Sequence, residues 1–296
     1  MGEYGRLIER LDDWKGDVVR MCKDRQWRIM ACVMLWCAVL LCGTAWALMD
    51  GIVWPEATGE LVSTANKLTI DYSHADQGYV MVHGSPNKGL KLQVETKKGK
   101  LLYDINSNEE WEIIPLQLGD GQYTFSLFVP ASGGKYASGG KMTIEAALGN
   151  DNAPYMIPTQ YVYYQPDTLA VAKSDEICAG LTTDQEKFDA IREYIKENYQ
   201  YDFAKAKSVT TGTLPSVDYA WDTGMGICQD LAALAACMLR VQGIPTRLDI
   251  GWVGKQRYYH AWNNVYLNGQ FVQYDPTTDV TNNAVPSGQY QLERWY

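Results

Sequence analysis

The dipeptide Asn268-Gly269 constrains the fold of the last third of this chain more than any other feature. Residues 258–267 before it and 270–275 after it are rich in aromatic and β-branched side chains. An Asn-Gly pair between two such runs is typical of a two-residue β-hairpin turn. A tight turn pairs Val265 with Val272, so the turn alone predicts the register of the whole hairpin.

One face of this hairpin gathers three side chains of chemical interest. The same register makes Trp262 face Asp275, and side chains of facing residues lie on the same side of a sheet. His260 then shares that face and is the diagonal neighbour of Asp275, about 7–8 Å away at the backbone. We expect the imidazole and the carboxylate to form a hydrogen bond.

A cysteine precedes the hairpin in the run Gly226-Ile227-Cys228-Gln229-Asp230. The apolar residues that follow have helical spacing as far as about Gly243, so Cys228 is expected in the first turn of a helix. Unpaired N–H groups and the helix dipole there favour a thiolate and can hold an oxyanion. We expect Gly224 and Gly226 to give a substrate room, and Asp230 to cap the helix.

A nucleophile, a base and an orienting group are the parts of thiol acyl-transfer catalysis. A single cysteine or histidine is more often structural. The joint occurrence of Cys228, His260 and Asp275 is what favours a catalytic interpretation.

Four motifs together resemble the transglutaminase-like superfamily of papain-type folds, over about residues 180–280. They are Gly226-Ile227-Cys228-Gln229-Asp230, Gly243-Ile244-Pro245-Thr246-Arg247, His260-Ala261-Trp262 and Asp275-Pro276-Thr277. The resemblance, to bacterial-type membrane-anchored or secreted members, implies Cys228 as nucleophile, His260 as base and acid, and Asp275 as orienter. It also implies an α+β core with a helix packed on an antiparallel sheet.

An aromatic or amide side chain often completes the oxyanion hole in such enzymes. Trp221 and Tyr201 are the candidates that the resemblance suggests, with a role in the core as the alternative for each. Arg247 is expected to be a structural ion-pair partner. The calcium sites of the animal enzymes are not carried over, and no metal or cofactor is expected.

The segment Ile29–Met49 has no charged residue and is long enough to cross a bilayer as a helix. Lys23, Arg25 and Arg28 precede it, so the positive-inside rule predicts residues 1–28 in the cytoplasm and the rest outside. A cleaved signal peptide, which would make the protein secreted, is the alternative. A start at Met21 would favour that alternative.

Charge and cysteine content limit the partners. The formal net charge is −9, which argues against a nucleic-acid partner. Beyond the apolar segment only Cys178, Cys228 and Cys237 remain. This odd number, without metal-ligand spacing, predicts neither a disulfide framework nor a zinc site.

The expected organisation has five parts. An amphipathic arm (1–28), the membrane segment (29–49) and a stalk (50–66) precede a β-sandwich (67–165) and a catalytic domain (166–296). Strand-like runs and a motif at Leu118–Tyr123 resembling a tyrosine corner favour an immunoglobulin-like sandwich, which either binds a ligand or acts as a spacer.

Two features of the catalytic domain bear on access to the site. The polar stretch Lys205–Ser216 is expected to be a loop that borders a cleft. The aromatic tail Tyr290–Tyr296 either covers the site or packs on the domain surface.

The sequence therefore predicts an extracytoplasmic, cysteine-dependent acyl-transfer enzyme that forms a thioester at Cys228. Its substrates would be peptide or glutamine-type amides, for example in cell-wall peptides or surface proteins. Hydrolysis and transamidation both stay open. The alternative is a catalytically inactive binding or assembly protein at the cell surface.

Overall fold

The computed structural model describes residues 52–84, 89–105, 110–283 and 285–296. The predicted arm (1–28) and membrane segment (29–49) lie outside these residues. Residues 52–296 form one compact unit. In the described part of the chain, no helix has both the length and the apolar character needed to span a membrane.

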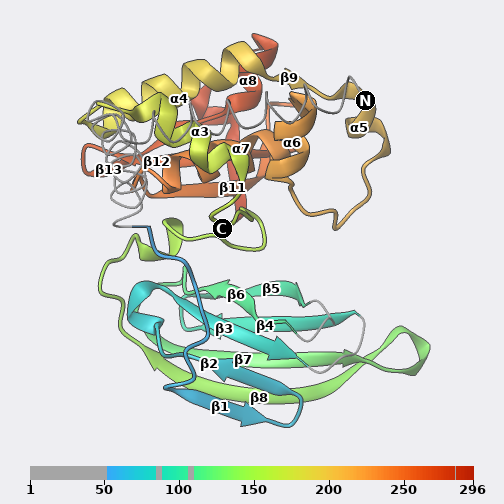
Figure 1. Ribbon diagram of the computed structural model, residues 1–296. Helices are drawn as coiled ribbons and strands as arrows, with labels where there is room; N and C mark the ends of the chain where they lie inside the picture. Colours follow the sequence, from blue (N-terminus) through green and yellow to red (C-terminus); the bar gives the residue numbers. More distant parts are fainter. Residues whose placement is uncertain (1–51, 85–88, 106–109, 284) are drawn as a thin grey trace, which may run out of the picture. The chain divides into compact units, whose positions relative to one another are not determined.

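The first part of this unit consists of two four-stranded antiparallel sheets (Figure 1). The first sheet has the order β1 (Val62–Ala65), β2 (Leu68–Asp71), β3 (Tyr79–Gly84), β6 (Glu112–Pro115). The second has the order β5 (Gly99–Ile105), β4 (Leu90–Thr96), β7 (Gly121–Pro130), β8 (Tyr136–Ala146). Apolar side chains of both sheets belong to one core. The last residues of the predicted stalk (50–66) are not irregular. Val62 and Thr64 are β-branched and belong to β1, which pairs with β2.

Tyr123 forms the hydrogen bonds expected of a tyrosine corner. Its side chain is fully buried, and its hydroxyl lies 2.7 Å from the Leu116 carbonyl oxygen and 2.9 Å from that of Gly119. The hydroxyl therefore holds the chain that enters β7. The immunoglobulin-like assignment of the two sheets stays a prediction.

The second part is an α+β domain with one antiparallel sheet of order β13-β12-β11-β14. Its strands are β11 (Thr246–Val253), β12 (Tyr258–Leu267), β13 (Gln270–Tyr274) and β14 (Tyr290–Trp295), and the short β9 (Gln200–Tyr201) and β10 (Met225–Gly226) pair with each other. Its helices are α3 (Leu169–Cys178), α4 (Asp184–Asn198), α5 (Phe203–Ser208), α6 (Val217–Thr223), α7 (Cys228–Arg240) and α8 (Pro276–Thr281).

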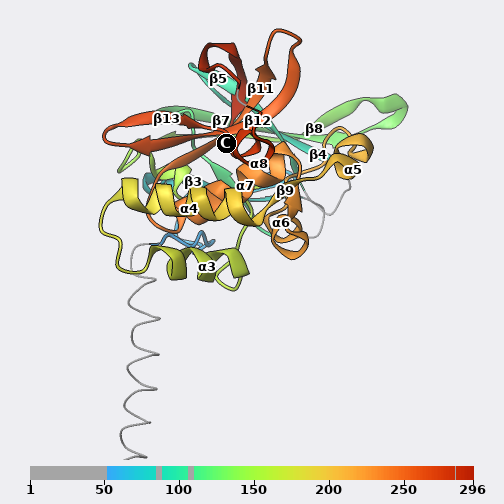
Figure 2. The same cartoon turned by 90° about the horizontal axis from the view of Figure 1, so that it is seen from above.

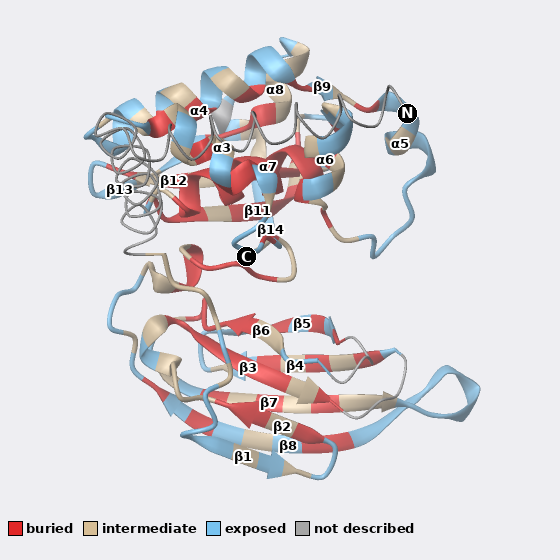
Figure 3. Ribbon diagram, in the orientation of Figure 1, coloured by how far each residue is buried: buried red, intermediate tan, exposed pale blue. Residues whose placement is uncertain are grey.

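Helix α7 is the centre of this domain. It contacts β11 and β12 of the sheet and also packs against α3, α4, α6 and α8 (Figures 1 and 2). From Asp230 to Arg240 every residue of α7 is buried, which Figure 3 shows as a nearly continuous red helix. The predicted helix packed on an antiparallel sheet is confirmed.

The hairpin forms in the predicted register, with Val265 opposite Val272. Asn268 and Gly269 both have positive φ, at 52° and 86°, as the tight turn requires. One detail was wrong, because the second strand stops at Tyr274 and Asp275 is the N-cap of α8. Pro276 cannot continue the ladder but suits the first turn of a helix, and aspartate is a favoured N-cap.

Two further expectations need correction. The stretch Lys205–Ser216 is not all loop, because α5 extends to Ser208 from a cap in which the Asp202 carboxylate accepts the N–H groups of Ala204 and Lys205. The aromatic tail is part of the sheet rather than a segment lying over it, and it borders the site through Tyr290 and Arg294. As β14 it pairs with β11 and becomes a strand of the sheet.

Candidate active site

Cys228 is the first residue of α7. The Asp230 carboxylate, which is fully buried, accepts the N–H groups of Ile227 at 3.1 Å and Ser216 at 3.1 Å, and it pairs with Lys205 Nζ at 2.7 Å. This fulfils the capping role expected of Asp230. The N–H groups of the first turn have no acceptor within the helix, so those of Cys228 and Gln229 can donate to a bound oxyanion.

The glycines before Cys228 serve the backbone conformation and the packing of this segment. They were expected to leave room for a substrate. Gly224 ends α6 with φ of +64°, a conformation that favours glycine. A Cβ on Gly226 would lie 3.0 Å from the Asp230 Cβ and 3.3 Å from Leu231 Cγ. Gly226 therefore allows close packing of the segment on α7, and it does not face an approaching substrate.

His260 links the cysteine to the aspartate. Its Nε2 atom lies 2.8 Å from Asp275 Oδ2, and its ring also interacts with the Cys228 side chain. The His260 side chain is 16% exposed and that of Asp275 is 3% exposed. The structure thus brings Cys228, His260 and Asp275 together in the predicted order, with the imidazole in the middle.

The surroundings of His260 shift its proton affinity. Burial alone would lower the pKa of His260, but its hydrogen bonds to Asp275 and Cys228 outweigh burial and raise the pKa to about 10. The imidazole therefore favours its charged form at neutral pH. A histidinium beside a thiol can both stabilise the thiolate and protonate a leaving amine.

Two aromatic residues complete the surroundings of the His260–Asp275 pair. Trp262 lies stacked on the His260 ring with centroids 6.5 Å apart. The Tyr290 hydroxyl donates to Asp275 Oδ2 at 2.7 Å, the same oxygen that His260 contacts. Trp262 was expected on this face, whereas the contact of Tyr290 could not be predicted, because the register of β14 is not marked by any turn.

Cys228 and His260 open onto one pocket of 250 Å³. A loop, Val209–Thr213, forms one wall, which confirms that the end of the polar stretch borders a cleft. The Gln229 side chain donates to the Thr213 carbonyl at 3.0 Å and holds this loop against the start of α7. The other lining residues come mainly from the sheet: Tyr161, Ile250, Tyr259, Ala261 and Arg294.

The two oxyanion candidates lie in different places. Tyr201 on β9 pairs with Gly226, two residues before Cys228. Burial, together with the nearby Cys228, raises the pKa of Tyr201 to about 12, so it is a neutral phenol that can donate. Trp221 on α6 lines another pocket, with Tyr163 and Asp222, which includes neither Cys228 nor His260.

The remaining described cysteines fit the structural interpretation. Cys178, Cys228 and Cys237 are all free thiols, and Cys178 and Cys237 are buried. Burial raises the pKa of Cys178 to about 11 and that of Cys237 further. Among the residues that the structure describes, no three metal-ligating side chains cluster in a way that could hold a metal ion.

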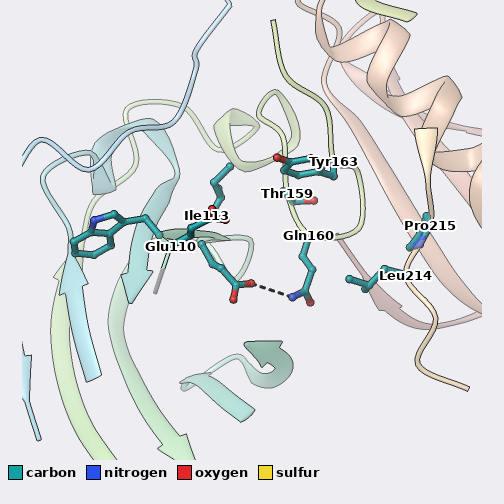
Figure 4. Close-up of a pocket in the computed structure, with 9 residues that line it drawn as sticks. Glu110, Ile113, Thr159, Gln160, Tyr163, Leu214 and Pro215 are labelled. Carbon is teal, nitrogen blue, oxygen red and sulfur yellow. Dashed lines mark hydrogen bonds between the residues drawn. The ribbon is translucent and has the colours of Figure 1, made fainter. Parts of the chain in front are cut away.

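A second pocket, of 330 Å³, lies beyond the same loop (Figure 4). Leu214 and Pro215, which follow the Val209–Thr213 wall, line it together with Tyr163 and residues 110–113. Gln160 crosses it and donates to Glu112 Oε2 at 3.2 Å. Neither Cys228 nor His260 lines this pocket, so the thiol chemistry belongs to the pocket of Cys228.

Comparison with known protein families identifies the domain that contains these residues. Residues 171–276 match the model of the transglutaminase-like superfamily, so this part of the chain is a transglutaminase-like domain, as the motifs predicted. No curated protein sequence matches the chain.

Several solved structures resemble the chain distantly. A candidate cysteine protease from Cytophaga hutchinsonii is 15% identical, with 80% of this chain and 83% of that one covered and a TM-score of 0.41. The periplasmic domain of TgpA from Pseudomonas aeruginosa is 14% identical, with 77% of each chain covered and a TM-score of 0.34. A TGase is 18% identical over 42% of this chain and only 34% of its own length, with a TM-score of 0.33.

Proposed function

We propose that this chain is a cysteine-dependent acyl-transfer enzyme that acts on peptide or glutamine-type amides through a thioester at Cys228. The observation that carries the proposal is the His260 imidazole, which hydrogen-bonds Asp275, interacts with Cys228 and lines the same pocket as Cys228. A structural cysteine needs no such partner. The pocket at this contact gives a substrate access to the thiol.

In the first half of the reaction, the Cys228 thiolate attacks the amide carbonyl carbon. The carbonyl oxygen becomes an oxyanion, to which we assign the N–H groups at the start of α7 as donors. The Tyr201 hydroxyl is the candidate for a further donor, because β9 pairs with the segment before Cys228. The His260 imidazolium then gives its proton to the amide nitrogen, the C–N bond breaks, and the amine leaves. A thioester and a neutral imidazole are left, with Asp275 and Tyr290 holding the ring in position.

In the second half, a nucleophile resolves the thioester. His260 takes a proton from water or from an amine as it attacks, and the thiolate is released. Water gives the acid, whereas an amine gives a new amide. The acceptor depends on which molecule reaches the pocket.

We further propose that the reaction takes place outside the cytoplasm. The charge-free segment Ile29–Met49 and the basic residues before it support an anchor with the catalytic domain (166–296) outside, and removal of the segment would make the protein secreted. A cell-wall peptide or surface protein fits this location. The β-sheet region (67–165) would then be an immunoglobulin-like spacer.

Product analysis with a glutamine-containing peptide, with and without a primary amine, tests the reaction. Release of ammonia with incorporation of the amine would show a transferase, release of ammonia alone a glutaminase, and cleavage of the chain a peptidase. Each product must vanish in Cys228→Ala. Turnover that survives this substitution would exclude the thioester.

Alkylation separates an enzyme from an inactive binding or assembly protein. We expect iodoacetamide to modify Cys228 rapidly, and His260→Ala to slow this modification at least tenfold, because the imidazolium that stabilises the thiolate is lost. Buried Cys237 serves as an internal control that should not react. Equal rates at Cys228 in both proteins would exclude the role of His260 and favour the binding protein.

A further inference from the structure

The pocket of Cys228 contains one permanently charged side chain among the residues described as lining it. That residue is Arg294, and no lining residue in this described set is Asp or Glu. Charge in a partly enclosed pocket is screened less than charge on an open surface. The electrostatic character of the pocket therefore depends on Arg294 and on the protonated His260.

Strand pairing places Arg294 on the same face of the sheet as Ile250 and Ala261. Arg294 on β14 pairs with Ile250 on β11, and Ile250 pairs on its other side with Ala261 on β12, the neighbour of His260. All of these residues line the pocket. Two strand spacings amount to about 10 Å, which is the span of a short peptide.

The protein itself leaves Arg294 incompletely satisfied. Its Nε is buried and has no hydrogen-bond partner among the described residues. The next residue along the chain, Glu293, is engaged elsewhere, because its carboxylate accepts from Trp252 Nε1 at 3.1 Å and from the Tyr259 hydroxyl at 3.1 Å. The guanidinium carbon of Arg294 lies 6.0 Å from the Tyr259 ring centre. Tyr259 and Glu293 stabilise its charge, but they leave Nε without an acceptor.

We infer that Arg294 binds a carboxylate of the substrate, and that the site selects peptides with a free carboxylate close to the amide that Cys228 attacks. A guanidinium recognises a carboxylate through two parallel hydrogen bonds, which gives both affinity and orientation. A C-terminal carboxylate or an acidic side chain next to the reacting amide supplies that group. The assignment of a substrate rests on the proposed function, whereas the preference for negative charge does not.

Iodoacetate and iodoacetamide are a matched pair of probes for this preference. In both, the Cys228 sulfur forms a bond to the methylene carbon and iodide leaves with the bonding electrons, but only iodoacetate carries a carboxylate. The ratio of the two alkylation rates at Cys228, measured in the full chain by peptide mass spectrometry, reports the charge that the pocket presents. His260 is the same in all variants, so a change of ratio belongs to Arg294.

We expect Arg294→Gln to lower the iodoacetate-to-iodoacetamide ratio about tenfold, and Arg294→Lys to retain part of the preference. Lys255→Gln is the matched control, because Lys255 is exposed and does not line the pocket, and it should leave the ratio unchanged. Arg294→Met provides a second neutral variant if the first does not fold. A ratio that is the same in wild type and in the folded neutral variants would overturn the inference.

Peptide substrates separate this inference from the proposed function. Glutaminyl-glycine with a free carboxylate should have a lower KM than its C-terminal amide in wild type, and the two should become alike in Arg294→Gln with little change in kcat. If neither peptide is turned over but the alkylation ratio still depends on Arg294, the charged pocket stands and the proposed function fails. If both peptides are turned over equally well, the inference fails and the proposed function stands.

Discussion

At the scale of single residues, the position of His260 depends on more than its own hydrogen bond to Asp275, because further hydrogen bonds fix the Asp275 carboxylate. Asp275 receives both the imidazole and the Tyr290 hydroxyl on one oxygen, while its other oxygen accepts the Thr277 N–H at 3.0 Å. The carboxylate is thereby fixed from three directions. An orienting group that cannot rotate keeps the imidazole in one position.

Tyr290→Phe should lower kcat by about two- to tenfold, which corresponds to the roughly 0.5–1.5 kcal/mol of one hydrogen bond. The change removes only the hydroxyl that holds Asp275, so KM should stay as it is. Steady-state kinetics on the glutamine peptide measure both constants. Tyr258→Phe is the control, because the Tyr258 hydroxyl contacts Gln256 rather than the site. An unchanged kcat in Tyr290→Phe would show that Asp275 needs no such support.

The pKa of His260 predicts a pH dependence of stability. Because the folded-state pKa is raised to about 10 from an ordinary 6.5, the charged imidazole contributes stability that is fully present below pH 6.5. That contribution is lost as the pH rises through 10. The difference in unfolding free energy between wild type and His260→Ala, measured in urea, should therefore decrease across this interval. A difference that does not vary with pH would contradict the shift.

At the scale of elements, the position of Cys228 depends on how α7 begins. The Asp230 carboxylate satisfies two backbone N–H groups and pairs with Lys205, so it joins α7 to α5 and to the segment before α6. Gln229 adds the loop Val209–Thr213 through the Thr213 carbonyl. The nucleophile and the pocket wall are therefore built around the same helix terminus.

Asp230→Ala should destabilise the protein by about 3–5 kcal/mol, because it leaves Lys205 and two N–H groups without their partner in a buried place. Denaturation in urea measures the loss. Asp222→Ala, an exposed carboxylate at the end of α6, should change stability by less than about 0.5 kcal/mol. Similar losses in the two variants would show that the buried pair contributes nothing beyond a surface charge.

Elements differed in how far they could be predicted. The hairpin register followed from Asn268-Gly269, and the structure contains a comparable local signal at the start of α4, the capping box of Thr183 and Glu186. Local chemistry determines both. The helix α5 and the strand β14 were missed because short segments are decided by their tertiary partners rather than by intrinsic preference.

At the scale of the molecule, one buried arginine joins the catalytic domain to the chain before it. Arg240 at the end of α7 is 1% exposed and donates to three carbonyl oxygens: Thr246 at 2.9 Å, Ile157 at 2.5 Å and Tyr296 at 3.1 Å. Burial lowers the pKa of Arg240 to about 10. The carbonyl dipoles thus compensate the charge of the guanidinium. Its hydrogen bonds connect α7 to Ile157, before the catalytic domain, and to the last residue, Tyr296.

Arg240→Met should cost about 2–4 kcal/mol of unfolding free energy, because three buried carbonyls lose their donor. Calorimetry or urea denaturation measures the change. Arg192→Met is the matched control, since Arg192 forms an exposed pair with Asp279 and such pairs contribute at most about 1 kcal/mol. If the two substitutions cost the same, Arg240 does not hold the parts together.

The sequence by itself determined the chemistry and its local geometry. Cys228 opens a helix, and His260 approaches Asp275, because a helix terminus and a two-residue turn are encoded within a few residues of each. The tertiary structure alone decided what surrounds that chemistry. Tyr290 and Arg294 reach the site only because β14 pairs with β11, some forty residues away along the chain. Such long-range pairing depends on the packing of the whole domain, which no local pattern encodes.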